Sequence, residues 1–225
     1  MNEIFDTHFG IAPDRLVDAG AETLYMVGWA LLLGTLLAIP IAVTLVLTRA
    51  DGILPNRPVF AALGALVNVV RSLPFIILMV VAMPLTKALV GTRIGTTAAL
   101  VPLTLYIGPF IARLFEASLL EVPRGIVEAA QSMGASTWQI VRHFLLPEAW
   151  PSIVLAVTTG AVTLVSATAM AGYIGGGGIG DIALTYGYQA FNAPLMALTV
   201  VALIVLVQSL QSLGNHLARR ARNKA

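Results

Sequence analysis

The chain of 225 residues is too apolar for an ordinary soluble protein, because 58% of its residues are hydrophobic and only 11% are charged, against about 25% charged residues in a typical soluble domain. Its net charge is only +2, and it has no stripes of alternating basic and aromatic residues, so nucleic acid is not an expected partner. The absence of cysteine excludes disulfides, thiol catalysis and cysteine-held metals. The composition predicts an all-α integral membrane protein.

Residues 1–21 form a polar, acidic lead with one possible short helix after Pro13. An acidic start does not match a secretory signal peptide, which needs a basic leading segment. Five apolar stretches follow, and the first exceeds the roughly 20 apolar residues that a membrane-spanning helix needs. The expected spans are about 24–47, 59–85, 96–112, 153–174 and 194–213, and residues 214–225 form a basic tail.

The second stretch contains Pro74 and two candidates for the substrate pathway, Asn68 and Arg71. Arg71 is the one charged residue that could lie at the depth of the hydrocarbon. Its side chain could extend to the inner interface, or it could be a functional charge that faces the interior of the bundle.

The segment 121–147, between the third and fourth spans, is amphipathic and charged. Gly134 suits the left-handed end of a helix, and Ser136 with Gln139 forms a capping box that starts a second helix. Pro147 is expected to end that second helix. The pattern predicts a helix–turn–helix hairpin in water, which either lies on lipid headgroups or docks a soluble partner.

One face of the fourth span carries polar and flexible side chains at helical spacing. These residues are Thr159, Thr163, Ser166 and Met170. Small neighbours, Gly160 and Ala167, favour close packing between helices. Alternatively, the stripe lines a polar path across the membrane, where the thioether of Met170 could contact an apolar side chain.

A glycine run follows the fourth span and includes Gly175, Gly177, Gly178 and Gly180. It matches G-x-G-x-x-G, but a dinucleotide site needs a preceding strand and a later acidic residue. We instead expect a tight turn at the outer membrane face and then a short re-entrant or surface helix. The three histidines lie in separate polar segments, and no catalytic constellation stands out, so neither a metal, a cofactor nor an enzyme is expected.

Basic residues indicate the orientation of the five expected spans, since they are enriched on the cytoplasmic side. An N-terminus outside and a C-terminus inside leave only Arg15, Lys87 and Arg93 on the outer side. The inner side then collects Arg49, Arg57, Arg71, Arg113, Arg124, Arg142, Arg219, Arg220, Arg222 and Lys224. The hairpin is therefore expected in the cytoplasm.

The hairpin resembles the EAA loop of permeases from binding-protein-dependent ABC importers. The resemblance rests on an E-A-A sequence, a glycine four residues after the second alanine and a later I…LP pattern: Glu128, Ala129, Ala130, Gly134, Ile140, Leu146 and Pro147. The chain from about Asp18 to Leu213 is similar to methionine importer permeases through the strings NVVRSLPFIILMVVAMPLT, VPLTLYIGPFIAR, EVPRGIVEAAQSMGAS and GGGGIGDIALTYGYQAFN.

The resemblance implies an ABC type-1 transmembrane domain over residues 18–213 in an inner membrane. It implies a second copy of the chain, two cytoplasmic ATPase subunits that receive the EAA loop, and an extracytoplasmic binding lipoprotein that delivers methionine. Mg-ATP would be bound by the ATPase partners, and the glycine run would close the outer end of the pathway.

Other solutes stay open, namely another amino acid, a quaternary ammonium osmolyte or a phosphonate. An autonomous channel or ion-coupled carrier is a further alternative. Such a carrier would usually need a carboxylate inside the membrane, whereas Glu22 and Asp181 are expected at the edges of spans and Glu116 just beyond the third.

Overall fold

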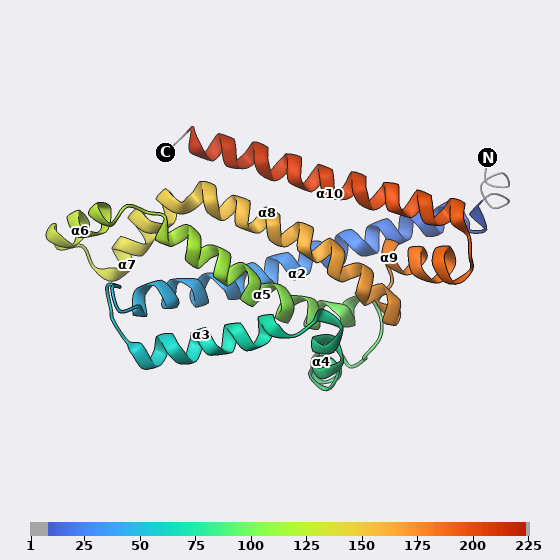
Figure 1. Ribbon diagram of the computed structural model, residues 1–225, viewed down its shortest axis with the longest axis horizontal. Coiled ribbons are helices and arrows are strands. Elements are labelled where there is room, and N and C mark those ends of the chain that lie inside the picture. Colours follow the sequence, from blue (N-terminus) through green and yellow to red (C-terminus); the bar gives the residue numbers. More distant parts are fainter. Residues whose placement is uncertain (1–8, 224–225) are drawn as a thin grey trace.

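A bundle of long helices forms the described part of the chain, residues 9–223, in this computed structural model (Figure 1). These residues contain helices and connections but no β-strand. Four helices are long and apolar enough to cross a membrane, or five if a bent pair counts as one span. The predicted all-α membrane fold is therefore confirmed.

The first span is one continuous helix, α2 (Pro13–Thr48). The short helix expected after Pro13 is thus not a separate element, because residues 13–21 of the expected lead belong to α2. Residues 1–8 lie outside the described part. Small residues of α2 pack against α5 (Thr96–Leu120). A Cβ added to Gly34 would overlap the side chain of Ile107, so glycine permits this close approach.

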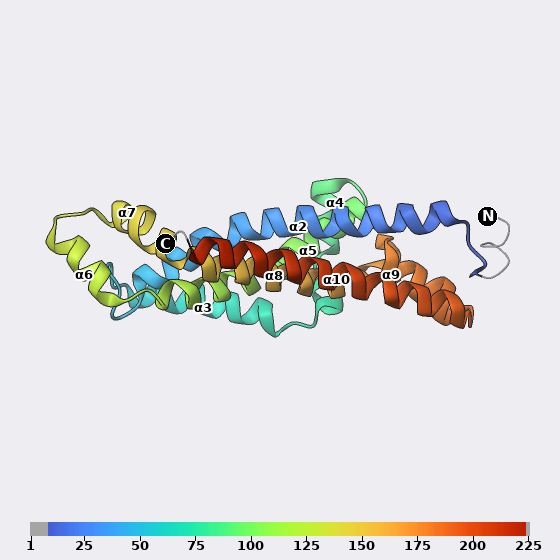
Figure 2. The ribbon, with the colours of Figure 1, turned by 90° about the horizontal axis from the view of Figure 1, so that it is seen from above.

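The expected second span, 59–85, is wrong as a single helix. The structure has α3 (Arg57–Ser72) and α4 (Phe75–Val90), with a bend of 111° between them. Pro74 lies at the break; it lacks a backbone N–H and disfavours a helical conformation in the residue before it. Leu73 is accordingly extended, with φ −81° and ψ 128°, and α4 projects sideways from the bundle (Figures 1 and 2).

Helix α5 lies at the centre of the bundle and contacts α2 and α8 (Leu146–Ala171). The last long helix, α10 (Ala193–Arg222), continues through most of the expected basic tail without a break. Residues 214–222 of the tail are therefore helical and continuous with the fifth span, and residues 224–225 lie outside the described part.

The hairpin consists of α6 (Arg124–Ser132) and α7 (Thr137–Ile140). A π-helical turn, η1 (Val141–Leu145), then joins α7 to α8, so helix runs from Thr137 to Ala171. The prediction that Pro147 ends the helix is wrong. The N–H of Leu146 bonds to the carbonyl of Val141, five residues back, and this wider turn accommodates a proline ring that would otherwise crowd the carbonyl of His143.

The connections lie at two ends of the bundle (Figure 1). The hairpin and the end of α10 lie at one end, whereas the start of α2 lies at the other end, together with α9 (Ile179–Asp181). The segment η2 (Gly172–Gly176), which is not helical at Ile174 and Gly175, and the π-helical segment η3 (Ile182–Gln189) flank α9. This arrangement separates the EAA-like residues from the glycine run by the length of the bundle.

Candidate coupling hairpin, membrane path and outer gate

Gly134 makes the turn between the two helices of the hairpin. Its φ is +79°, a conformation that favours glycine. Its N–H donates to the carbonyl of Gln131 at 2.9 Å, and the N–H of Ala135 donates to the carbonyl of Ala130 at 3.0 Å. This pair of hydrogen bonds is a Schellman motif, so the expected left-handed helix end is present.

The second helix of the hairpin begins at the expected capping box. The hydroxyl of Ser136 accepts the N–H of Gln139 at 3.4 Å, and the side-chain oxygen of Gln139 accepts the N–H of Ser136 at 2.7 Å. These bonds satisfy amide groups that a helix start leaves without partners. Both ends of the turn are therefore fixed by short-range hydrogen bonds.

The EAA-like residues divide between the inside and the surface of the hairpin. Ala130 and Ile140 are buried, and Leu146 is half-buried. The exposed members are Glu128, Ala129, Gly134 and Pro147. Within the described part of the chain, the carboxylate of Glu128 has no hydrogen bond or ion pair, so it is free to meet another molecule.

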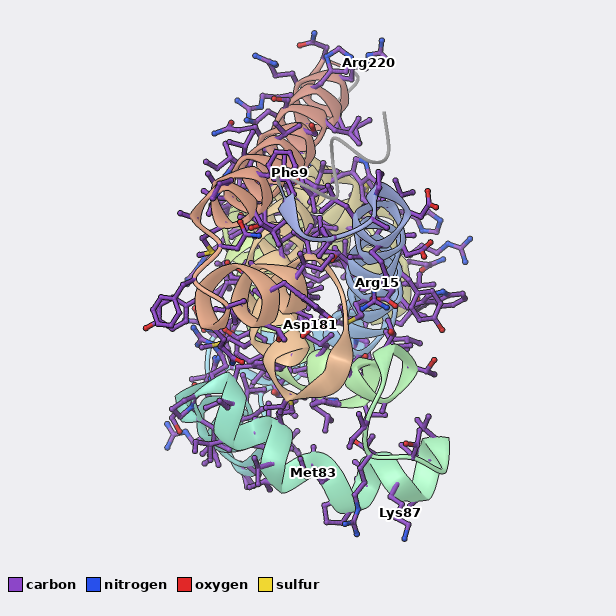
Figure 3. All side chains as sticks on the ribbon, turned by 90° about the vertical axis from the view of Figure 1, so that its right-hand side faces the viewer. Phe9, Arg15, Met83, Lys87, Asp181 and Arg220 are labelled. Carbon is purple, nitrogen blue, oxygen red and sulfur yellow. The ribbon has the colours of Figure 1, made fainter. Side chains whose placement is uncertain are left out.

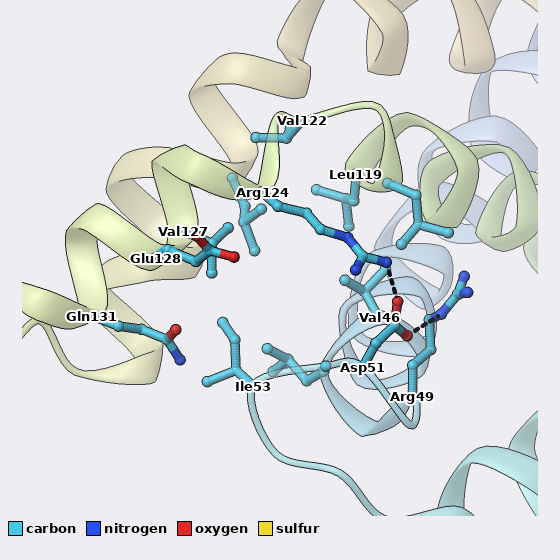
Figure 4. A pocket seen from close by; sticks show the side chains of 14 residues that line it. Val46, Arg49, Asp51, Ile53, Leu119, Val122, Arg124, Val127, Glu128 and Gln131 are labelled. Atoms are coloured by element: carbon cyan, nitrogen blue, oxygen red, sulfur yellow. Dashed lines mark hydrogen bonds and ion pairs between the residues drawn. The ribbon is translucent and has the colours of Figure 1, made fainter.

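An open cavity of about 410 Å³ separates the hairpin from the end of α2 (Figure 4). Arg124 of α6 forms an ion pair with Asp51 in the loop after α2, and Arg49 reaches the same carboxylate at 3.2 Å. A hydrogen bond from its own backbone and then the one from Arg49 hold the pKa of Asp51 below its ordinary value. Sequence reasoning missed this contact because nothing near Asp51 indicates which arginine it meets.

A partly buried charge pair inside α5 was also missed. Nη1 of Arg113 donates to Oε2 of Glu116 at 2.6 Å, and Nη2 donates to Oδ1 of Asn68 at 2.9 Å and to the carbonyl of Gly64 at 3.2 Å. Glu116 lies inside α5 rather than just beyond the span, because the helix continues to Leu120. The spacing of three residues between arginine and glutamate was the available signal.

Asn68 and Arg71, both expected near the membrane path, have different surroundings. Asn68 accepts the hydrogen bond from Arg113 and so helps to join α3 to α5. Arg71 is exposed in the last turn of α3 and has no hydrogen bond or ion pair with any described residue. In this protomer, Arg71 therefore does not face the interior of the bundle.

The polar stripe and the small residues of α8 lie on adjacent faces of the helix. Thr159, Ser166 and Met170 are exposed and Thr163 is half-buried, whereas Gly160 packs on Ile111, whose Cδ1 would lie 2.8 Å from an added Cβ. Ala167 is buried as well. Close packing and a polar face are thus properties of different sides of one helix.

The glycine run forms a tight turn against α2. Gly175, Gly177 and Gly178 have φ values of +89°, +75° and +88°, and Gly180 packs against the backbone of Ala169. Figure 3 looks onto this end of the bundle, where Arg15 and Asp181 are labelled. The expected turn is present, and a helical segment that continues through η3 follows it.

The family described as "binding-protein-dependent transport system inner membrane component" matches residues 30–223. The chain belongs to this family. A probable D-methionine transport system permease protein, MetI, of Vibrio cholerae is 56% identical over 212 residues, which cover 94% of each chain. The methionine import system permease protein MetP of Bacillus subtilis is 38% identical and covers 94% of this chain and 96% of its own.

A solved structure gives the same assignment. A chain from the inward-facing MetNI methionine ABC transporter is 44% identical, has a TM-score of 0.90, and covers 92% of this chain and 96% of its own. A chain from an amino acid ABC transporter with histidines shares the fold, with 18% identity and a TM-score of 0.75. The protein is therefore a multi-pass permease subunit of an ABC importer and not an enzyme.

Proposed function

We propose that this permease carries methionine inward, as a dimer of two copies coupled to two ATPase subunits that bind and hydrolyse Mg-ATP. An extracytoplasmic binding lipoprotein would deliver the solute. The observation that carries the proposal is the 44% identity and TM-score of 0.90 to a MetNI chain, together with relatives named for methionine import.

The hairpin would transmit work from the ATPase to the membrane helices. Glu128 and Gly134 are exposed at its surface and would be seated in a cleft of the ATPase. Because helix continues from Thr137 to Ala171, a displacement of the hairpin would move α8 with it. This continuity supports direct mechanical coupling between the ATPase and the polar stripe.

The path for the solute would run along the stripe of Thr159, Thr163, Ser166 and Met170. Polar groups are unfavourable against lipid tails, so an exposed polar face in one protomer fits better against the same face of a second copy across an aqueous path. The hydroxyls of Thr159 and Thr163 donate to carbonyls of their own helix, at 3.0 and 2.9 Å. Met170 would offer a soft contact to an apolar side chain.

The hairpin would lie in the cytoplasm, with the N-terminus outside and the C-terminus inside. Basic residues at the hairpin end of the bundle support this orientation because such residues are enriched on the cytoplasmic side. They include Arg49, Arg124, Arg142 and Arg220. Labelling from each side of the membrane would test it.

The proposed function can be tested with the full transporter in vesicles, supplied with the binding protein and ATP. We expect uptake of labelled methionine that Glu128→Lys abolishes while membrane insertion stays normal. Gly125→Ala is a matched control in the same helix, because its added Cβ meets nothing within 4 Å. Normal ATP-driven uptake by the Glu128→Lys protein would contradict the coupling role of the hairpin. Competition of other solutes with the uptake of labelled methionine identifies the substrate.

A further inference from the structure

The glycine run is held against α2 by two neighbouring side chains. Oε2 of Glu22 accepts the N–H of Gly178 at 2.7 Å, and the hydroxyl of Thr23 accepts the N–H of Ile179 at 2.9 Å. In each of the two hydrogen bonds, the donor and the acceptor residues are 156 positions apart in the sequence. We propose that Glu22 is a gate-positioning residue: it holds the outer end of the pathway closed and releases the glycine run when the pathway opens outward.

The glycine run is shaped to fit around the Glu22 carboxylate. A Cβ on Gly177 would overlap Oε2 of Glu22, and a Cβ on Gly178 would lie 2.7 Å from the hydroxyl of Thr23. Both glycines also have left-handed φ values, which L side chains rarely adopt. Backbone conformation and close approach thus both require glycine opposite α2.

The bond to Glu22 is suited to hold two elements in register. A hydrogen bond from a backbone N–H to a carboxylate is stronger than one between neutral groups. Glu22 is only half-exposed, and partial burial strengthens such a bond further. On separation from Gly178 the carboxylate can be hydrated, because Glu22 is half-exposed.

The glycine run is attached firmly to the end of α8. An added Cβ on Gly172 would lie 2.6 Å from the backbone nitrogen of Asp181, and one on Gly180 would overlap the backbone of Ala169. The last turn of α8 and the glycine run therefore form one compact unit. If α8 moves with the hairpin, as the proposed function requires, this unit moves relative to α2, and the contacts at Glu22 and Thr23 form the joint.

A second contact at the same end supports the location of this joint. The N–H of Gly95, at the start of α5, donates to the carbonyl of Gly175 at 3.0 Å. That bond joins two neutral backbone groups. Among the described residues, Glu22 has the only carboxylate that accepts a backbone N–H from the glycine run. Glu22 is therefore the side chain whose substitution should shift the closed state most selectively.

The test uses the natural absence of cysteine. In the complete transporter in vesicles, without nucleotide, a single Ser166→Cys reporter on the stripe is exposed to a membrane-impermeant maleimide on the binding-protein side. We expect Glu22→Ala to raise the labelling rate about tenfold, equivalent to about 1.4 kcal/mol in the closed–open equilibrium. Asp18→Ala is the matched control, because Asp18 lies one turn earlier on α2 and is exposed, and its labelling should equal that of the reporter alone.

A purely structural role would lower the thermal unfolding temperature of Glu22→Ala without changing access to the reporter in folded protein. That result would overturn the proposal. If Glu22→Ala fails to fold, Glu22→Gln decides, since the amide keeps an acceptor oxygen but loses the charge. We expect folded Glu22→Gln to raise the labelling rate above that of the reporter alone, but by less than tenfold. An unchanged labelling rate would also overturn the proposal.

The proposal rests on the proposed function, yet the two fail separately. Labelling measures closure of the outer end without ATP, binding protein or solute. A Glu128→Lys protein that still imports would contradict coupling through the hairpin and leave the labelling result unaffected. Unchanged labelling of Glu22→Ala beside normal methionine import would contradict only the role of Glu22.

Discussion

Arg124 of the hairpin and Asp51 of the loop after α2 form an ion pair across 73 positions of sequence. It is a direct link between α6 and the end of the first membrane span. The hairpin is joined through the chain to α5 and α8, and this ion pair adds a contact with α2. A push on the hairpin can therefore also reach the first span.

The ion pair should affect coupling more than stability. Exposed ion pairs contribute little to folding, and Arg124 has a side chain that is 78% exposed. We expect Asp51→Asn and Arg124→Gln each to lower ATP-driven uptake several-fold with little change in the unfolding temperature. The double variant should be no worse than either single one, because both remove the same contact. Strictly additive losses would show that the two side chains act independently.

The same contact predicts a defined pH dependence. The pKa of Asp51 is held below its ordinary value of 3.8, first by a hydrogen bond from its own backbone and then by Arg49. Because the pKa of Asp51 is lower in the folded protein than in the unfolded chain, the stabilisation from this contact is complete above the unfolded-state pKa. It is lost as the pH falls through the folded-state pKa. Protease access to the hairpin should therefore stay constant between about pH 5 and 8 and rise only in stronger acid. In Asp51→Asn it should be raised throughout this range.

The Arg113–Glu116 pair should matter for stability. Removing one partner leaves the other without compensation, which costs about 3–5 kcal/mol when both are fully buried. The side chain of Arg113 is 22% exposed, so we expect a smaller loss, about 1–3 kcal/mol, for Arg113→Ala or Glu116→Ala. Thermal unfolding in detergent measures it. Arg71→Ala is the control, since Arg71 is exposed, and an equal loss there would contradict the assignment.

Alanine substitutions at Gly134 and Gly125 distinguish the effect of backbone strain from that of steric overlap. An added Cβ meets nothing within 4 Å at either position, but only Gly134 has a left-handed φ. Gly134→Ala should lose about 1–2 kcal/mol of local stability, whereas Gly125→Ala, inside α6, should gain about 0.4–1 kcal/mol. Hydrogen exchange of the hairpin amides tests both. Equal protection in the two variants would show that the turn does not depend on its left-handed residue.

Local features of the hairpin were predictable from the sequence alone. The left-handed Gly134 and the capping box of Ser136 and Gln139 involve residues at most five positions apart, and short-range hydrogen bonds set their geometry. The membrane class followed in the same way from composition, since apolar helices of sufficient length have few alternatives to a bilayer. The E-A-A pattern added the family, which the comparisons confirmed.

The prolines show where the local sequence no longer predicts the structure. Pro40, Pro102 and Pro109 lie inside continuous helices, whereas Pro74 lies at a 111° bend. The ring has the same chemistry in every case. Packing around it decides whether the helix continues, and a sequence does not contain that information locally.

The sequence by itself determined the membrane class, the hairpin turn and the family, because each depends on composition or on residues a few positions apart. Only the tertiary structure decided that Arg113 bonds to Asn68, 45 positions away, and Glu22 to Gly178, 156 positions away. Such pairs form when packing of whole helices brings distant side chains within about 3 Å. The sequence around a polar residue does not indicate which distant residue it will contact.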